Sequence, residues 1–530
     1  MANKNILLIE PGYKNKYPPL GLMKIAQYHG PNGKCDNVKF IKGLDKSVLN
    51  TCWDRIYVTT LFSFEWKKIS EAIDFAITAA SGHSNNVFVG GIAASLMHEA
   101  FIQEKRWAGV RFIQGLLNQA PAISLQLDPF QEELYSEDTT GRPIEDQIPD
   151  YSILSQVDYK FPVCDAYLAY ATRGCVRKCS FCGVPKLEGD QYDTPSLTTI
   201  VQGIEKLYGP KKDLVLMDNN LVASTKFKEI IAEIRDLGFT AGAKLKRGRT
   251  SVQRRVDFNQ GMDARILCTD PKYLRELASI CTDPLRIAFD HLTYREMYET
   301  SVRYAHRVGL FSLSNYLLYN FTDTPDDLYQ RMWLNIQLNE ELDIRIFSFP
   351  MRYQPTNMKD RSHVGKKWNR YYLRSMQLIL HATHGIVSGA PAFFRRAFGA
   401  TADEFKDLLI KPHKFIFNRD WFEELEGRPE LDAYHTEFRR LSPADRADLL
   451  QALSGFDTCG RYQAVRANIS NTRVASIFRF YQPLDDEEEA DMWRRQKELR
   501  AAALAVPVAV PDDQRVEDAC LELDPILEKK

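Results

Sequence analysis

The sequence predicts an α/β protein in which two successive series of parallel strands precede a mainly helical C-terminal part. Short apolar segments alternate with amphipathic, helix-like segments up to Gly91, and the alternation returns between Asp165 and Tyr353. Beyond about residue 360 the helical pattern continues and no strand-like run is clear. Strands that alternate with helices are typical of parallel sheets covered by helices. With 530 residues, 44% hydrophobic and 26% charged, the chain has the composition of a globular protein with several cores.

In the first series, each apolar run predicts a strand and each amphipathic run a helix. The strands are NILLIEP, NVKFIKG, RIYVTTL and NNVFVGG, and the helices are LGLMKIAQYHG, after the first strand, and FEWKKISEAIDFAITAA, after the third. Ligands of such sheets bind beyond the carboxyl ends of the strands, which here lie near Pro11–Pro19 and Gly90–Gly91. These prolines and glycines would also serve simply to turn the chain.

The second series follows a polar, irregular linker from Leu127 to Leu154. Its strands are DAYLAYATRGC, KDLVLMDNN, RVDFNQGMDARIL, PLRIAFD, LFSLSNYLLYNF and IRIFSFPMRY, with helical segments such as STKFKEIIAEIRDLG and TYREMYETSVRYAHRVG between them. Six β/α units of this kind predict a partial or full parallel barrel, in which the chemistry lies where strands end and loops begin.

The expected domain boundaries follow from these changes of pattern. We expect an α/β domain at residues 1–145, a barrel at 160–356, a helical domain at 357–485 and a charged, flexible tail at 486–530.

Charge and cysteine content indicate the environment of the protein. The formal net charge is -1, so no global field attracts nucleic acid or an anionic membrane. No apolar run approaches the roughly 20 residues that span a bilayer, and the start of the chain lacks the features of a secretory signal. Ten cysteines without an export signal favour a reducing compartment, and we expect a cytoplasmic protein.

Three of the cysteines, Cys175, Cys179 and Cys182, are spaced C-x-x-x-C-x-x-C at the end of the first strand of the second series. A disulfide would leave one thiol unpaired and suits an oxidising compartment. A closed zinc site needs four ligands, and no partner pair is apparent, although His83, His98 or a lone cysteine would complete the set. Three thiolates on an iron–sulfur cluster with one open iron fit the count directly. Arg173, Arg177 and Lys178 would help to hold the thiolates ionised.

This spacing, with Phe181 before the last cysteine and Gly183 after it, resembles the motif of the radical S-adenosylmethionine (SAM) superfamily. The resemblance implies that Cys175, Cys179 and Cys182 hold a 4Fe-4S cluster whose open iron binds the amino and carboxylate groups of SAM. An electron from an external donor, such as flavodoxin or ferredoxin, would then cleave SAM to a 5′-deoxyadenosyl radical that abstracts hydrogen from the substrate. It also implies that Phe181 is the wall beside the adenine.

Later segments are similar to the weaker SAM-contacting elements of that family. The second strand ends in an acid and two amides, the third-strand motif offers an arginine for the SAM carboxylate, and the segment after the fifth strand departs from the family's Gly-Pro at Asn320 and Phe321. The SAM contacts that the resemblance implies are Phe181, Gly183, Asp218, Asn219, Gln260, Asp263 and Arg265.

The first α/β domain resembles the cobalamin-binding-type Rossmann domain that precedes many radical SAM barrels, so the resemblance covers roughly residues 5–355. It implies a Rossmann-like domain, a partial (β/α)6 TIM barrel and a helical C-terminal domain, with Pro19, Gly90 and Gly91 as candidate cobalamin contacts. The D-x-H-x-x-G signature, whose histidine ligates cobalt, is absent. Cobalamin bound without a histidine ligand and a relic domain without cobalamin are therefore both open.

The expected function is reductive cleavage of SAM and hydrogen abstraction from a small-molecule or peptide substrate. Methyl transfer to carbon would follow if cobalamin binds, and rearrangement or oxidation of the substrate would follow without it. The methylthiotransferase branch would need a second cysteine triad, whereas the first domain has only Cys35 and Cys52. The basic insertion KLKRGRTSVQRR favours a solvated loop over a nucleic-acid contact. The alternative is a catalytically quiet iron–sulfur protein that acts as a sensor or interaction module through its C-terminal domain.

Overall fold

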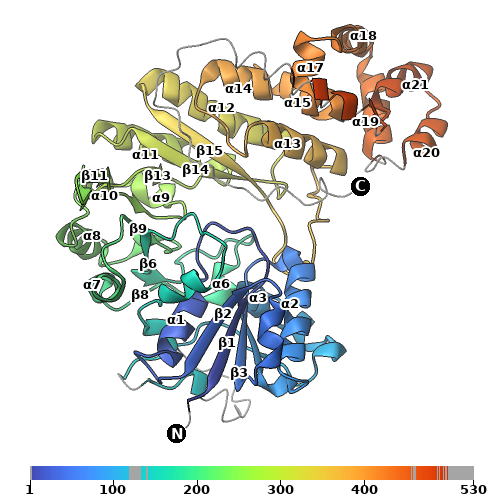
Figure 1. Ribbon diagram of the computed structural model, residues 1–530. Helices are drawn as coiled ribbons and strands as arrows, with labels where there is room; N and C mark the ends of the chain where they lie inside the picture. The colour runs from blue at the N-terminus through green and yellow to red at the C-terminus, as the bar shows by residue number, and fades with distance from the viewer. Residues whose placement is uncertain are drawn as a thin grey trace. The chain divides into compact units, whose positions relative to one another are not determined.

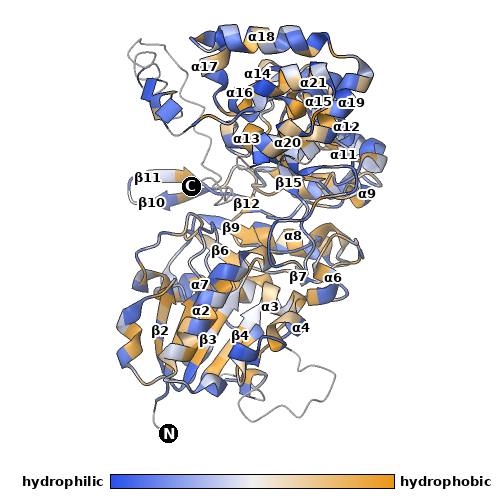
Figure 2. Ribbon diagram, turned by 90° about the vertical axis from the view of Figure 1, so that its right-hand side faces the viewer, coloured by the Kyte–Doolittle hydropathy of each residue, from blue (hydrophilic) through white to orange (hydrophobic). Residues whose placement is uncertain are grey.

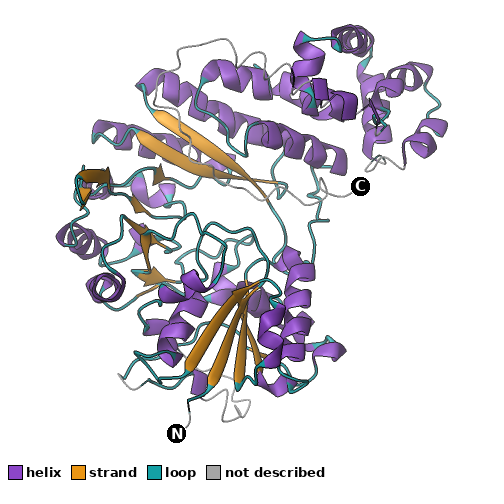
Figure 3. Cartoon of the chain, in the orientation of Figure 1, coloured by secondary structure: helices purple, strands orange, loops and turns teal. Residues whose placement is uncertain are grey.

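The computed structural model confirms a mixed α/β protein with parallel sheets and many helices (Figure 3). It describes residues 3–118, 133–138, 141–454, 456, 461–485, 487–488, 490–492, 494–495 and 498. Most of the predicted tail at 486–530 and part of the predicted linker lie outside these residues, as do Cys459 and Cys520. Within the described ranges, no helix is both long enough and apolar enough to cross a bilayer.

The chain divides into two compact units. The first comprises Met1–Tyr316, Leu342–Ile346 and Tyr353–His363, and the second comprises Leu317–Glu341, Phe347–Arg352 and Val364–Lys530. The bounds of the four domains expected from the sequence remain predictions.

The N-terminal part of the first unit is a five-stranded sheet with the order β2-β1-β3-β4-β5, in which all neighbours are parallel (Figure 1). Its strands are β1 (Asn5–Glu10), β2 (Asn37–Lys42), β3 (Arg55–Thr60), β4 (Val87–Gly91) and β5 (Arg111–Phe112). Its helices are α1 (Leu20–His29), α2 (Trp66–Ala79), α3 (Ile92–Leu96) and α4 (His98–Ile102). The strand order reverses between β1 and β3, and ligands of doubly wound sheets bind beyond the strand ends at such a point.

The predicted apolar runs form the core of this sheet. Leu7, Ile56 and Val89 are fully buried from three adjacent strands, and Ile69 and Ile73 of α2 pack in the same cluster. The apolar character of β3 and β4 is visible in orange in Figure 2. Apolar residues that recur every three or four positions therefore place one face of α2 on the sheet, as their periodicity predicts.

The second series has the predicted alternation of strands and helices. The strands are β6 (Ala166–Ala169), β9 (Asp213–Leu216), β12 (Val256–Asp257), β13 (Leu285–Arg286), β14 (Ser312–Tyr319) and β15 (Arg345–Arg352). They form the orders β12-β9-β6 and β13-β14-β15, and parallel bridges from Val256 to Thr282 and from Met262 to Ile287 join β12 to the segment around β13. The intervening helices are α7 (Leu197–Tyr208), α8 (Phe227–Asp236), α9 (Ala264–Leu267), α10 (Lys272–Ala278), α11 (Arg295–Arg307) and α12 (Pro325–Leu342).

Two segments of this series differ from expectation. The third strand has only two residues, because Asn259 adopts a left-handed φ of 45° and the chain leaves the extended conformation there. The basic insertion, which we expected to be a solvated loop, is exposed but forms an antiparallel hairpin of β10 (Lys244–Arg247) and β11 (Thr250–Gln253). Its turn contains Gly248 at a φ of 58°, which glycine adopts without strain.

The C-terminal part of the second unit is helical, and its described residues contain no strand after β15. Its helices are α13 (Arg370–Ala382), α14 (Pro391–Phe398), α15 (Ala402–Ile410), α16 (His413–Phe417), α17 (Arg419–Glu424), α18 (Arg428–Arg439), α19 (Pro443–Ser454), α20 (Tyr462–Ala467) and α21 (Thr472–Phe478). Aromatic side chains, including Tyr371, Phe415, Tyr434 and Phe478, make up much of its core. Large aromatic side chains thus stabilise this part of the chain by burial.

Candidate functional site

The three clustered cysteines lie on one loop between two short antiparallel strands. β7 (Thr172–Arg173) pairs with β8 (Tyr192–Asp193), and α6 (Val184–Leu187) begins two residues after Cys182. The hairpin pairing closes the loop at its base, so Cys175, Cys179 and Cys182 are held in one place. All three thiols are free and partly exposed.

The base of this loop requires a glycine directly before the first cysteine. Gly174 has a φ of 72°, and a Cβ atom on it would lie 2.2 Å from the carbonyl oxygen of Asp190. The Cys175 N–H donates to the carbonyl oxygen of Gly189 at 3.3 Å. The two sides of the loop therefore meet backbone to backbone at Gly174.

Glu188 connects the loop to the end of the second strand. Its carboxylate accepts the Gly174 N–H at 2.7 Å and the Asn219 side-chain amide at 2.9 Å, and it forms an ion pair with Arg173 at 3.5 Å. Arg173 also pairs with Glu145 at 3.6 Å and lies over the Tyr170 ring. Arg173 thus forms ion pairs with acidic side chains, whereas we expected it to help keep the thiolates ionised. The local sequence does not indicate this role of Glu188, because its hydrogen-bond and ion-pair partners come together only when the chain folds.

The surroundings of two of the sulfur atoms favour the neutral thiol, so a bound cluster would have to displace their protons. Burial raises the pKa of Cys179, while Arg265 opposes this shift by its charge and a hydrogen bond. Burial likewise raises the pKa of Cys182, and the neighbouring Cys179 and Cys175 raise it further. The Arg177 N–H donates to Cys175 Sγ at 3.4 Å. N–H donors to sulfur are a feature by which proteins tune iron–sulfur clusters.

The same donor set does not fit a single metal ion. Nowhere among the described residues do three His, Cys, Asp or Glu side chains come close enough together to hold one ion. In a 4Fe-4S cluster each thiolate binds a different iron atom, so the sulfur atoms need not converge on one point. Three cysteines on one loop match in number the protein ligands of a 4Fe-4S cluster with one open iron.

The third-strand motif meets the cysteine loop through charged side chains. Asp263 accepts from Arg265 Nε at 2.6 Å and from Arg177 Nε at 2.7 Å. Although burial opposes it, these hydrogen bonds hold the pKa of Asp263 below its usual range. Arg265, the expected partner of the SAM carboxylate, is thus paired with Asp263 and hydrogen-bonded to Cys179. Its expected role remains a prediction.

Asp218 is directed toward the chain that leads into the cysteine loop. Its side chain is 2% exposed and accepts the N–H groups of Ala171 and Thr172 and the Thr172 hydroxyl, the last at 2.7 Å. Burial raises its pKa to about 6. These contacts occupy the carboxylate of a residue that the resemblance implied as a SAM contact.

The titration of Asp218 predicts a pH dependence of stability. Its folded-state pKa, about 6, is above the ordinary value of 3.8, so the folded state binds this proton more tightly. The stability that this proton contributes is therefore present below about pH 4 and is lost as the pH rises through 6. Relative to Asp218→Asn, the wild-type free energy of unfolding should fall by about 1 to 2 kcal/mol between pH 5 and 7.5. Chemical unfolding at several pH values measures this difference, and a constant difference would contradict it.

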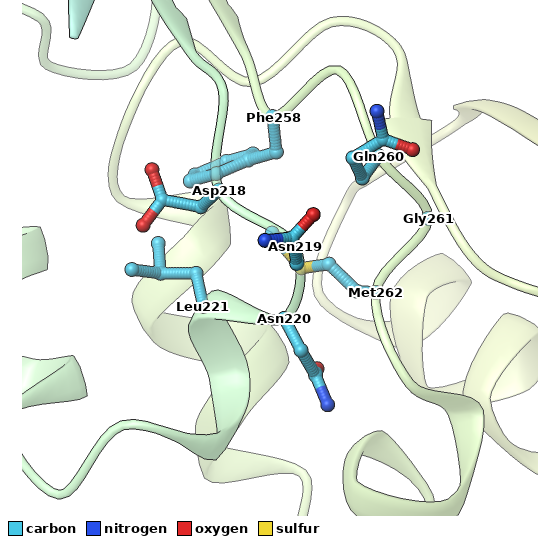
Figure 4. Close-up of a pocket in the computed structure, with 8 residues that line it drawn as sticks. All are labelled: Asp218, Asn219, Asn220, Leu221, Phe258, Gln260, Gly261 and Met262. Carbon is cyan, nitrogen blue, oxygen red and sulfur yellow. The ribbon is translucent and has the colours of Figure 1, made fainter. Parts of the chain in front are cut away.

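A small pocket lies at the ends of the second and third strands of the series. It is lined by Asp218–Leu221 and by Phe258, Gln260, Gly261 and Met262, as Figure 4 shows. Three of the predicted SAM contacts, Asp218, Asn219 and Gln260, thus meet at one cavity. Its cavity volume is about 10 Å³, far below the roughly 300–1,000 Å³ of a complete ligand site. The cavity as it stands has room for about one water molecule.

The edge of the N-terminal sheet lies beside the cysteine loop. α3 begins directly after Gly91 and packs against α6. A Cβ atom on Gly183 would come within 2.9 Å of Leu96 Cδ1 on α3 and within 3.6 Å of Thr356. A second cavity of about 310 Å³ opens here, lined by Ser95–Ala100, Gln114 and Asn357.

The remaining residues that the sequence analysis singled out are each held by their own local contacts. Gly90 accepts a hydrogen bond from the Thr60 hydroxyl, and Gly91 has a φ of 99°, where a Cβ atom would lie 2.5 Å from the carbonyl oxygen of Thr60. Pro19 is buried at the start of α1, and Phe181 is half-buried between Cys179 and Cys182. In the second unit, Asn320 has a φ of 69°, so it adopts the left-handed conformation that a glycine would supply.

Comparisons with known proteins add one structural likeness. No family model and no curated protein matches the sequence. Among solved structures, the chain is similar to the radical S-adenosylmethionine methyltransferase TsrM from Kitasatospora setae, determined with cobalamin and a [4Fe-4S] cluster bound. The identity is 14%, the TM-score is 0.44, and the match covers 68% of this chain and 78% of that chain. A likeness of this degree does not by itself indicate the function of the chain.

Proposed function

We propose that this protein is a radical SAM enzyme in which Cys175, Cys179 and Cys182 hold a 4Fe-4S cluster. The observation that carries the proposal is the gathering of three free thiols on one closed loop, with N–H donors to sulfur. The pocket lined by Asn219 and Gln260 is connected to the loop through the hydrogen bond of Asn219 to Glu188. When bound, the cluster would supply the electron that cleaves SAM.

The chain's own residues would position these groups and exclude water. Gly174 and Glu188 close the base of the cysteine loop, and Asp263 ties the loop to the third-strand segment through Arg177. Asn219 and Gln260 would contact SAM, with Phe181 beside its adenine. In this proposal a partial radical SAM barrel is formed by six strands that alternate with helices, namely β6, β9, β12, β13, β14 and β15.

The N-terminal sheet would hold cobalamin at the same edge. Its strand order reverses between β1 and β3, the second cavity lies where α3 follows β4, and α3 contacts the helix that follows Cys182. A group in this cavity would be close to the cluster loop, as methyl transfer from cobalamin requires. Pro19, Gly90 and Gly91 remain candidate contacts to it.

The proposal predicts formation of 5′-deoxyadenosine. The full chain is reconstituted anaerobically with iron and sulfide, supplied with SAM and dithionite, and analysed by liquid chromatography and mass spectrometry. We expect 5′-deoxyadenosine in amounts that depend on SAM and dithionite. A protein that holds a full cluster yet releases none would overturn the enzyme proposal and leave the sensor or interaction module.

Cobalamin is tested separately by its absorption spectrum after purification from cells supplied with it. Failure of the protein to retain cobalamin would remove the methyl-transfer branch and leave hydrogen abstraction unaffected.

A further inference from the structure

Tyr17, in the loop that follows β1, reaches a segment that lines the pocket of the second series. Its hydroxyl donates to Asn259 Oδ1 at 2.6 Å, although 242 residues separate the two positions in the chain. The ring is largely buried, and burial together with Asp257 raises the pKa of the phenol well above its usual value. The hydroxyl is therefore protonated and available as a donor.

Asn259 is held by several hydrogen bonds in a left-handed backbone conformation. Its φ is 45°, a region that asparagine adopts more readily than most residues other than glycine. The residue is 7% exposed, its N–H donates to Asp257 Oδ1 at 2.8 Å, and its carbonyl oxygen accepts from the Tyr316 hydroxyl at 3.1 Å. Tyr17 supplies the partner of its side-chain oxygen.

The segment held in this way forms one wall of the pocket. Phe258, Gln260, Gly261 and Met262 flank Asn259 and line the cavity opposite Asp218–Leu221 (Figure 4). At one end, Asp257 is fixed by two hydrogen bonds from Arg286, each 3.0 Å long. At the other, Met262 donates its N–H to the carbonyl oxygen of Arg286 at 2.9 Å. Asn259 lies midway between these two anchors.

We propose that Tyr17 is a positioning residue for SAM, acting through Asn259 to hold the Phe258–Met262 wall in its binding conformation. The proposal rests on the proposed function and adds to it a contribution from the N-terminal sheet. The β1–α1 loop lies at the carboxyl end of β1, beside the reversal of strand order where that sheet would bind its own ligand. One wall of the pocket is therefore supported, through Asn259, by a residue from the loop that follows β1.

The test is Tyr17→Phe in the full chain, with Tyr159→Phe as the matched control. Tyr159 donates its hydroxyl to the Asn15 carbonyl oxygen at 2.7 Å, so the control removes a hydrogen bond to the same loop without touching the pocket wall. Hydrogen exchange of peptides covering residues 256–263 is measured without added ligand, and SAM affinity is measured by equilibrium dialysis after cluster reconstitution.

In Tyr17→Phe we expect exchange in this segment to be faster and SAM to bind about three- to tenfold more weakly, the effect of one neutral hydrogen bond. Iron content and the midpoint of thermal unfolding should be unchanged, and Tyr159→Phe should match the wild type in both measurements. Equal exchange and equal SAM affinity in wild type and Tyr17→Phe would overturn the inference, as would an equal effect of Tyr159→Phe. A wild-type protein that fails to bind SAM would instead overturn the proposed function.

Discussion

Cys179→Ser should abolish cluster binding and, with it, all SAM cleavage. Cys179 is the central member of the triad and accepts a hydrogen bond from Arg265, which ties it to the third-strand motif. Serine is close in size but is a poor iron ligand, so the cluster would lose one of three protein ligands. We expect the iron and sulfide content of the reconstituted variant to fall to background and 5′-deoxyadenosine to be undetectable.

The matched control is Cys164→Ser, which makes the same chemical change at an exposed cysteine outside the cluster loop. It should retain the wild-type iron content. If Cys179→Ser also retains it, these cysteines do not bind the cluster and the proposed function is wrong.

Gly174→Ala should have the second-largest effect. Alanine would adopt an unfavourable φ of 72° and place its Cβ 2.2 Å from the Asp190 carbonyl oxygen, so the backbone at the loop base must move. The movement would separate β7 from β8, break the Gly174 N–H contact with Glu188 and displace Cys175. We expect a local cost of several kcal/mol, about 1 to 2 kcal/mol of it from the left-handed conformation alone.

Gly189→Ala separates the cost of the left-handed conformation from the cost of the contact with Asp190. Gly189 lies in the same loop with a φ of 75°, but a Cβ on it would meet no atom within 4 Å. Gly189→Ala should therefore retain most of its iron, whereas Gly174→Ala should lose most of it, as measured by iron analysis after identical reconstitution. Equal losses in the two variants would show that conformation alone, and not the contact with Asp190, determines the effect.

The parts of the candidate site that consist of residues close together in the chain could be predicted from the sequence. The cysteine spacing, the position of the triad after the first strand of the second series and the segments around Asp218 and Gln260 could all be recognised locally. The structure brings Asp218, Asn219 and Gln260 to one pocket. The partners of the charged residues were not predictable: Arg173 pairs with Glu145 and Glu188, and Arg265 with Asp263.

The α/β class and the order of strands and helices follow from local patterns, because the spacing of apolar residues along one segment decides which side of it is buried. Contacts between distant segments explain why the third strand ends after two residues, why Glu188 closes the cysteine loop and why Tyr17 reaches Asn259. Hydrogen bonds and ion pairs such as these join residues up to 242 positions apart. Their partners are set by how the chain folds back on itself, which no local pattern records.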